Sequence, residues 1–307
     1  MKWPSAPTSS NVKSLLLFHC RDIMRFLGGG YILLCLVIGI QTQTFTFNLD
    51  MSINAFDDQY EGCTDQMEEE VITKLLNEEK KDIEFGRTWD MATSRWRTMR
   101  LSVPQGFKDE YGIAIMAYTN YDSKVFSDFN TAVRNFKPYT FKYHSLHFFL
   151  TRGVRLLRSS CWWKPWEVYR GLSGVNFYPP TIGENIRFGQ FSSSSTNKTI
   201  AENFGKDTFF TISSCFGVDV KKFSYKPKQE EILIPVDEIL QVTNYTKEEN
   251  NQRYILKTTK KRCHYYNCEY LQRGGPSSSC VESEGMRILS SPVVISLVLC
   301  ILASSPS

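Results

Sequence analysis

The spacing of apolar and polar residues differs between the two halves of the chain. In the first half, apolar side chains recur at steps of three and four, the repeat that places them on one face of a helix. This spacing predicts helices over Asp65–Glu79, Trp89–Leu101 and Phe141–Leu157. The first half is therefore expected to be mainly helical.

The second half contains short runs of β-branched and aromatic residues, separated by Gly, Asn, Pro and Ser. These runs predict strands over Val168–Gly171, Ile186–Phe191, Phe209–Ser213 and Ile232–Pro235. Helices followed by short strands indicate an α+β fold with mostly antiparallel pairing, rather than a doubly wound parallel sheet. No Gly-x-Gly-x-x-Gly motif follows a strand, which disfavours a Rossmann-type dinucleotide site.

The N-terminal end has the pattern of a secretory signal. Basic residues precede an apolar run over Tyr31–Ile40, and polar residues follow it. We expect residues 1–43 to be a signal peptide. A membrane-anchoring helix is the alternative, but ten apolar residues are too few, because a span needs about 20.

The C-terminal end has the pattern of a lipid-anchor signal. Small residues at Ser277–Ser279 are followed by a polar spacer and an apolar tail over Val293–Ala303. This order is typical of attachment of a glycosylphosphatidylinositol (GPI) anchor. We expect residues 276–307 to be the spacer and removed tail, and residues 44–275 to be one domain on the extracellular face of the plasma membrane. A short single-pass tail and a secreted form are the alternatives.

Composition excludes some classes without naming a function. The 307 residues carry a formal charge of +4, with 42% hydrophobic and 22% charged residues, which is typical of a globular protein. No run of Lys and Arg is long enough to predict nucleic-acid binding. Among four histidines, His144 and His147 are three residues apart. Because no further ligand stands at a suitable spacing, we expect no metal site.

The cysteines agree with an oxidising compartment. Of nine, Cys20, Cys35 and Cys300 lie in the two signals, and Cys280 lies at or beyond the expected cleavage point. Five remain, which predicts two disulfides and one odd thiol without giving the connectivity: Cys63, Cys161, Cys215, Cys263 and Cys268. In a secreted chain, Asn197-Lys-Thr and Asn244-Tyr-Thr are glycosylation sequons.

Two segments of the second half carry residues suited to chemistry. Arg170 ends the strand Val168–Gly171, where Gly171 permits close backbone approach. Farther along, Arg187–Thr196 is a β run that ends in five consecutive hydroxyl residues. Taken singly, the first also fits a structural arginine and the second a polar loop.

A third segment, Lys228–Pro235, has two acids at the opening of a buried strand, where Asp and Glu are uncommon. Strand alternation would place Gln229 and Glu231 on one face and Glu230 on the other. An exposed edge strand with solvated acids is the alternative for this segment alone.

Taken together, these segments resemble the arginine–serine–glutamate arrangement of the mono-ADP-ribosyltransferases, with Arg170, Ser193 and Glu231 in that order. The extracellular vertebrate branch is more similar still, and the resemblance covers Phe45 to Tyr270. Five blocks carry it: Asn54–Cys63, Phe148–Arg152, Val168–Gly171, Arg187–Phe191 and Glu230–Pro235.

The resemblance implies an enzyme that opens NAD, or NADP, at the nicotinamide–ribose bond in a cleft of the sheets, with no permanent cofactor. Glu231 would stabilise the positive charge on the ribose, Arg170 would bind the pyrophosphate, and Ser193 would orient Glu231. Further dinucleotide contacts would come from Tyr118, Gln190 and Ser224, and Phe204 would stack on nicotinamide. The acceptor would be water or arginine side chains of cell-surface or secreted proteins. The implied disulfides are Cys63–Cys268 and Cys161–Cys215, with Cys263 odd.

Gln229 departs from the arginine-modifying pattern. Arginine-modifying members carry Glu at this position, where it can hold and activate the incoming guanidinium. An amide offers neither the charge nor a site for the proton. In the T-cell surface branch that this chain resembles, Gln here accompanies transfer to water. We therefore expect NAD hydrolysis to dominate over arginine transfer.

Two rival interpretations use the same residues differently. A catalytically silent, GPI-anchored surface binding protein could retain the scaffold without turnover. A secreted serine hydrolase could use the run Ser192–Ser195 as nucleophile, but the chain lacks Gly-x-Ser-x-Gly and a suitable His partner.

Overall fold

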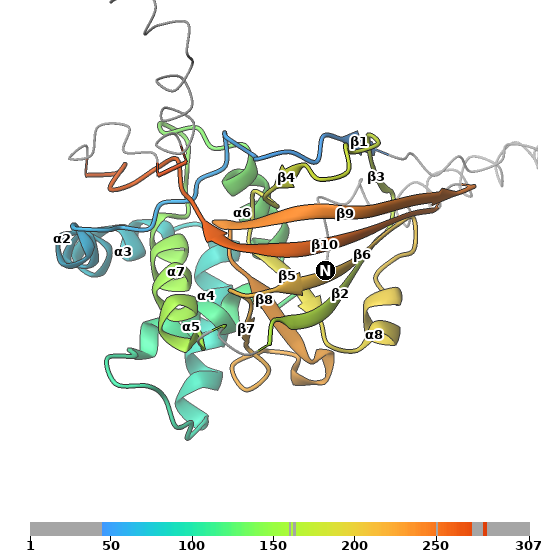
Figure 1. Ribbon diagram of the computed structural model, residues 1–307. Helices are drawn as coiled ribbons and strands as arrows, with labels where there is room; N and C mark the ends of the chain where they lie inside the picture. The colour runs from blue at the N-terminus through green and yellow to red at the C-terminus, as the bar shows by residue number, and fades with distance from the viewer. Residues whose placement is uncertain (1–44, 160, 162–163, 250, 272–278, 281–307) are drawn as a thin grey trace, which may run out of the picture.

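The computed structural model describes residues 45–159, 161, 164–249, 251–271 and 279–280. Most helices gather beside one end of a large sheet (Figure 1). The expected signal peptide, the Ser277–Ser278 part of the anchor site and the apolar tail lie outside the described residues. Within the described part of the chain, no helix combines the length and the apolarity that a membrane span requires.

The helical part begins with a continuous segment of three pieces and continues through four separate helices. Their bounds are α2 (Thr64–Glu70), the π-helical turn η1 (Val71–Leu75), α3 (Leu76–Glu79), α4 (Ile83–Thr98), α5 (Asp109–Tyr118), α6 (Val125–Arg134) and α7 (His144–Leu157). The segment α2–η1–α3 and helix α7 fall where the repeat of apolar residues predicts them. Helix α4 begins earlier than expected, because Asp82 caps it by accepting the N–H groups of Glu84 and Phe85.

The strands form an α+β arrangement that is mostly antiparallel, as predicted. Eight strands pair in the order β4-β9-β10-β6-β2-β5-β8-β7, and only the pair β10–β6 in this sheet is parallel. The bounds are β2 (Trp166–Leu172), β4 (Asn185–Ile186), β5 (Ser192–Ser195), β6 (Thr208–Ser214), β7 (Val218–Asp219), β8 (Glu231–Ile234), β9 (Glu238–Glu248) and β10 (Asn251–Arg262). A separate parallel pair joins β1 (Phe45–Phe47) to β3 (Val175–Phe177).

The expected strand over Ile186–Phe191 is wrong. Strand β4 ends at Ile186, and Gly189 turns the chain with φ +64°. The hydroxyl residues that follow form the buried strand β5, which lies between β2 and β8. Serine is accommodated there because its hydroxyl can donate to the backbone, as from Ser194 Oγ to the Ile232 carbonyl at 2.8 Å.

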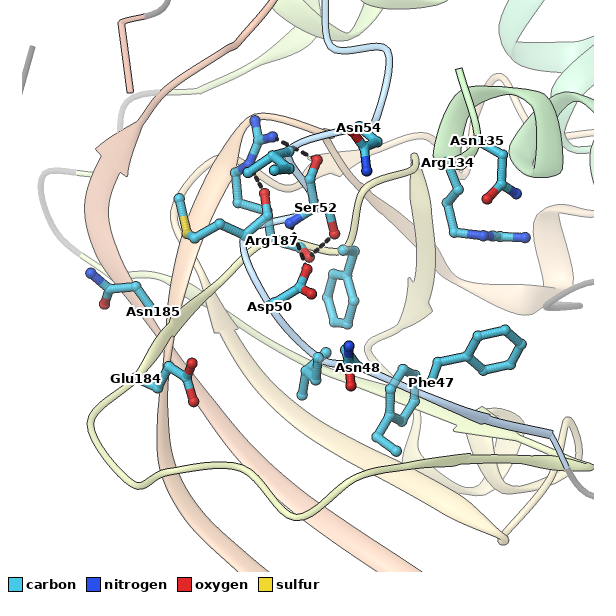
Figure 2. A pocket seen from close by; sticks show the side chains of 15 residues that line it. Phe47, Asn48, Asp50, Ser52, Asn54, Arg134, Asn135, Glu184, Asn185 and Arg187 are labelled. Atoms are coloured by element: carbon cyan, nitrogen blue, oxygen red, sulfur yellow. Dashed lines mark hydrogen bonds between the residues drawn. The ribbon is translucent and has the colours of Figure 1, made fainter. Parts of the chain in front are cut away.

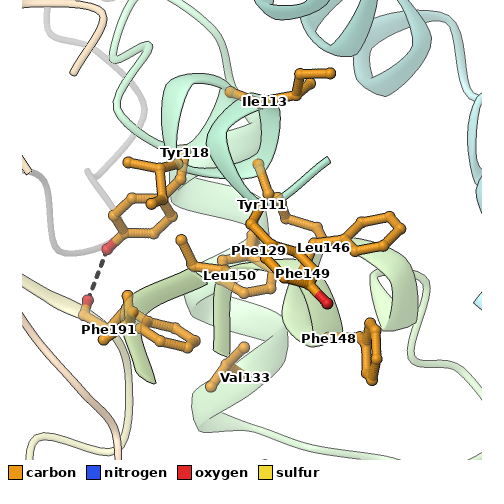
Figure 3. Close-up of a cluster of buried hydrophobic side chains, with 14 of the residues drawn as sticks. Tyr111, Ile113, Tyr118, Phe129, Val133, Leu146, Phe148, Phe149, Leu150 and Phe191 are labelled. Atoms are coloured by element: carbon orange, nitrogen blue, oxygen red, sulfur yellow. Dashed lines mark hydrogen bonds between the residues drawn. The ribbon is translucent and has the colours of Figure 1, made fainter. Parts of the chain in front are cut away.

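An aromatic core joins the helices to the start of β5 (Figure 3). The Tyr118 hydroxyl donates to the carbonyl of Phe191 at 2.7 Å, and the rings of Phe129 and Phe191 stack with centroids 6.0 Å apart. Another member, His147, lies wholly buried, with its ring nitrogens against the Tyr60 hydroxyl and the Phe56 carbonyl. This histidine is therefore an interior residue, and its burial lowers its pKa to about 3.

Two adjacent aspartates tie the start of the domain to its end. Asp57 and Arg187 form an ion pair in which both side chains are fully buried. Asp57 also accepts the N–H groups of Tyr265 and Tyr266, at 2.9–3.0 Å. Asp58 accepts N–H groups at Cys268 and Glu269. The block Asn54–Cys63 therefore fixes the segment after β10.

Three disulfides close the described chain. The structure pairs Cys63 with Cys268 and Cys161 with Cys215. It also pairs Cys263 with Cys280, so the expectation that Cys263 is odd is wrong. That expectation assigned Cys280 to the removed tail. In the structure, the neighbouring Ser279 Oγ accepts the N–H of His264 at 2.9 Å, which holds this end beside β10.

Candidate active site

Three neighbouring strands carry Arg170, Ser193 and Glu231. Strand β2 pairs with β5 at Tyr169 and Ser195, and β5 pairs with β8 at Ser195 and Glu231. Across this arrangement, Arg170 Nη1 donates to the carbonyl of Ser193. Residues distant in sequence are therefore adjacent because the strand order β2-β5-β8 brings them together.

The Glu231 carboxylate accepts hydrogen bonds on both oxygens. The Tyr121 hydroxyl donates to Oε1 at 2.5 Å, and Ser224 Oγ donates to Oε2 at 3.5 Å. Tyr121 also contacts Ser193 Oγ at 3.2 Å. The pKa of Glu231 is raised above its ordinary value, because the effect of burial outweighs the hydrogen bonds from Ser193, Tyr121 and Ser224 that lower it. Burial and the nearby Glu231 charge raise the pKa of Tyr121, so its phenol remains a donor.

Tyr121 is a site residue that the sequence analysis missed. It follows α5, far from the arginine, serine and glutamate segments, and it reaches Glu231 only in the folded chain. Nothing local distinguishes it from the other tyrosines among the 15 in the sequence.

Several buried polar atoms of the site lack a hydrogen-bond partner among the described residues. They are Nε and Nη2 of Arg170, both amide atoms of Gln190 and Oε1 of Gln229. A buried donor or acceptor without a partner costs free energy, and each such group in a folded protein calls for an explanation. A ligand rich in hydrogen-bonding oxygens, such as a dinucleotide, fits this set.

Tyr118, Gly171 and Phe204 have roles in the fold around the site. The Tyr118 hydroxyl accepts from Asn130 Nδ2 at 3.1 Å as well as donating to Phe191, so it supports the start of β5. A Cβ at Gly171 would lie 2.3 Å from the Gly205 carbonyl oxygen, so here the close approach is made by backbone after α8 (Lys198–Glu202). Phe204 is half-buried in that same turn.

The strand alternation expected across Gln229, Glu230 and Glu231 is wrong. Pro227–Gln229 form the 3₁₀ turn η2, and Glu230 is left-handed at φ +49°, so β8 begins only at Glu231. The Gln229 carbonyl accepts from Ser195 Oγ at 2.8 Å, which holds the turn against β5. Glu230 instead pairs with Lys221, at 3.7 Å.

The two predicted glycosylation residues are exposed. Asn197 caps α8, with its Oδ1 accepting the N–H of Thr199 at 3.0 Å. Asn244 lies on β9, and its Oδ1 accepts the N–H of Tyr245. Their modification remains a prediction.

The structure also contains a pocket of about 520 Å³ (Figure 2). It lies between the chain that follows β1 and the end of α6, and Phe47, Arg134 and Arg187 are among its lining residues. None of Arg170, Ser193 and Glu231 lines it. Burial, together with the Arg170 charge, lowers the pKa of Arg134 to about 9. Arg134 thus lies within electrostatic reach of the candidate site.

Comparison with known proteins identifies the family. A family model described as NAD:arginine ADP-ribosyltransferase matches residues 49–264. This chain belongs to that family. Rat T-cell ecto-ADP-ribosyltransferase 1 is 40% identical over 242 residues, covering 76% of this chain and 83% of the rat protein. Mouse GPI-linked NAD(P)(+)–arginine ADP-ribosyltransferase 1 is 33% identical over 298 residues, covering 87% and 91%.

A solved ADP-ribosyltransferase has the same fold. The crystal structure of the eukaryotic mono-ADP-ribosyltransferase ART2.2 matches with a TM-score of 0.64 and 38% identity, covering 73% of this chain and 99% of that one. Variants of ART2.2 have been crystallised with NADH and with NAD. The family resemblance and the α+β expectation are therefore confirmed, and NAD is the substrate of this family.

Proposed function

We propose that this chain cleaves NAD, or NADP, at the nicotinamide–ribose bond, with Arg170, Ser193 and Glu231 in the catalytic site and water as the main acceptor. The observation that carries the proposal is the hydrogen-bonded Glu231 carboxylate on β8, two strands from Arg170 on β2. Membership of the family and the NAD complexes of ART2.2 support it.

The reaction requires the protein mainly to hold a negative charge beside the ribose. The bond between C1′ and the nicotinamide nitrogen breaks, and its electron pair leaves with neutral nicotinamide, so no general acid is needed. Positive charge then develops on the ribose, and a fixed carboxylate at Glu231 stabilises that transition state more than the ground state. The unpartnered guanidinium N–H groups of Arg170 suit a pyrophosphate.

The acceptor completes the reaction at C1′. Water attacks with an oxygen lone pair and then loses a proton, which gives ADP-ribose. A guanidinium acceptor would instead form a C1′–N bond and lose a proton from nitrogen. Gln229 can hydrogen-bond such an acceptor but cannot attract its charge or take its proton, which supports hydrolysis as the main reaction.

We expect Gln229→Glu to move the reaction towards arginine transfer. The full-length protein is purified from mammalian cells and given NAD with and without agmatine, a soluble guanidine. Nicotinamide release measures cleavage, and ADP-ribosylagmatine measures transfer. The share transferred should rise about tenfold or more, because a carboxylate both binds and activates the guanidinium.

Gln229→Ala is the control, since it removes the amide without adding a charge. Wild-type protein that modifies agmatine faster than it hydrolyses NAD would contradict the assignment of water as main acceptor. Binding of NAD without any nicotinamide release would instead favour the silent surface protein.

Tyr121→Phe should shift the pH dependence of NAD cleavage. The hydrogen bond from Tyr121 lowers the pKa of Glu231, and cleavage requires the ionised carboxylate. Without that bond the Glu231 pKa rises, so activity is lost at a higher pH as the solution is acidified. At neutral pH we expect the rate of NAD cleavage to fall about tenfold, the scale of one hydrogen bond to a charged group.

Tyr111→Phe is the matched control, because the Tyr111 phenol donates to a carboxylate elsewhere, at Glu68. Its pH profile should match the wild type. An unshifted acidic limb in Tyr121→Phe would argue against Glu231 as the titrating group.

We further propose that the protein is held on the outer face of the plasma membrane by a GPI anchor. The mouse relative named GPI-linked supports this location. The disulfide from Cys263 to Cys280 moves the expected attachment point, because cleavage at Ser277–Ser279 would leave Cys280 on the removed tail. Attachment should therefore follow Cys280. Release of the protein from cells by a phosphatidylinositol-specific phospholipase, with Cys280 found in the released chain, is the expected result.

A further inference from the structure

An exposed ion pair joins residues that neighbour, along the chain, the two hydroxyl groups in contact with Glu231. Asp122 Oδ1 and Lys226 Nζ are 2.7 Å apart, and their side chains are 72% and 37% exposed. Asp122 directly follows Tyr121, whose hydroxyl contacts Glu231 Oε1. On the other side, the Lys226 N–H donates at 3.0 Å to Ser224 Oγ, which contacts Glu231 Oε2. The pair thus joins the two segments that hold Glu231.

Lys226 is held in this position by its neighbours. The N–H of Tyr225 donates to Thr119 Oγ1 at 2.8 Å, and the Arg95 guanidinium lies 4.5 Å from the centre of the Tyr225 ring. Beyond Lys226, its carbonyl accepts the N–H of Gln229. The lysine and the acceptor-selecting glutamine therefore belong to one short turn, fixed at both ends.

Asp122 supplies the kind of group that position 229 lacks. A carboxylate binds a guanidinium through two parallel hydrogen bonds. It binds an ammonium group, such as that of a lysine, only as a point charge. An exposed ion pair contributes little free energy, so a guanidinium can displace Lys226 from Asp122. Asp122 is exposed and directly follows Tyr121, which contacts Glu231, so its carboxylate is open to an incoming guanidinium.

We propose that Asp122 is the binding site for the guanidinium of an arginine acceptor and that Lys226 competes with the acceptor for it. This proposal rests on the proposed NAD cleavage and names what limits its transfer branch. When Lys226 occupies Asp122, water is the acceptor. When a guanidinium replaces Lys226, its nitrogen forms a bond to C1′ as the nicotinamide leaves with the electron pair, and its proton passes to Asp122 and then to solvent.

Lys226→Gln tests the proposal, with NAD and agmatine as substrates and full-length protein. We expect the fraction of cleaved NAD that reaches agmatine to rise about fivefold, the upper end of the effect of one exposed ion pair. Nicotinamide release without agmatine should persist, because the substitution keeps the backbone N–H that Lys226 donates to Ser224 Oγ. The double variant Asp122→Asn with Lys226→Gln should lose the gain.

Two further variants separate competition from a general change of charge. Lys228→Gln removes a positive charge from the same turn, and Lys80→Gln breaks the similarly exposed pair with Asp90, also at 2.7 Å. Both should leave the agmatine fraction unchanged. An unchanged fraction in Lys226→Gln, or a gain that persists in the double variant, would overturn the proposal while normal nicotinamide release leaves NAD cleavage standing. No release from any of these proteins would overturn both.

Discussion

Glu231→Gln is expected to lower nicotinamide release from NAD by about 10²–10³-fold, the scale of losing one preorganised charged contact to a transition state. The amide keeps the size of the side chain and one of its two acceptor oxygens but removes the charge that stabilises the ribose cation. NAD binding should persist, because Arg170 and Gln190 retain their unpartnered polar atoms. The initial rate of nicotinamide release and the affinity for NAD, measured by calorimetry, report the two effects separately.

Glu230→Gln is the matched control for this experiment. Glu230 is the neighbouring residue, but it turns away to Lys221 and Thr196. Its replacement should leave the rate within about twofold, because the group makes only exposed contacts. Equal losses in the two variants would mean that Glu231 has been given the wrong role.

Asp57→Ala is expected to lower the free energy of unfolding by about 3–5 kcal/mol, because it leaves the buried Arg187 charge without its carboxylate. The same change removes the acceptor for the N–H groups of Tyr265 and Tyr266. For a domain of this size, such a loss lowers the melting temperature by about 10 °C. Thermal denaturation with the disulfides intact would measure it.

Asp65→Ala is the control for that experiment, since Asp65 is an exposed acid in the first turn of α2. It should cost less than about 1 kcal/mol. The melting temperature of Asp57→Asn should fall between those of Asp57→Ala and Asp65→Ala. An amide still accepts hydrogen bonds but does not neutralise the charge of Arg187. A melting temperature of Asp57→Ala close to the wild type would show that Arg187 finds another way to satisfy its charge.

Periodicity that reflects one buried face predicted some elements and missed others: helix α6, with Phe126, Phe129 and Val133 buried on one face, was not predicted. Helix α7 carries Arg152 and Arg155 beside its apolar residues and was predicted within three residues at its start, although His144–Thr151 are all buried. Helix α5 was not predicted, because Tyr111 to Tyr118 are buried on every side and leave no polar stripe. Strand β5 was interpreted as the end of a strand, since four serines look polar unless their backbone partners are known.

The site shows the same division. Arg170, Ser193 and Glu231 could be proposed because their order matches a family pattern. Tyr121 and the pair Asp122–Lys226 could not, because the contacts that give them meaning join segments about 100 residues apart. The partner of Cys263 was missed for a related reason: its pairing with Cys280 depends on where the chain after β10 turns back.

The disulfide between Cys263 and Cys280 also defines where a mechanical load would enter the domain. A pull on the chain beyond Cys280 passes through the covalent link to Cys263, at the end of β10. The loop between the two cysteines is bypassed, and with it the contacts of Asp57 and Asp58 to Tyr265 and Cys268. The load is delivered to β10, which pairs with β9 from Asn251 to Arg262 and with β6 over Gln252–Lys257 (Figure 1). Tension from a C-terminal tether therefore falls on β10 and on Cys263, whose carbonyl accepts from Arg187 Nη1 at 2.8 Å, and bypasses the loop held by Asp58.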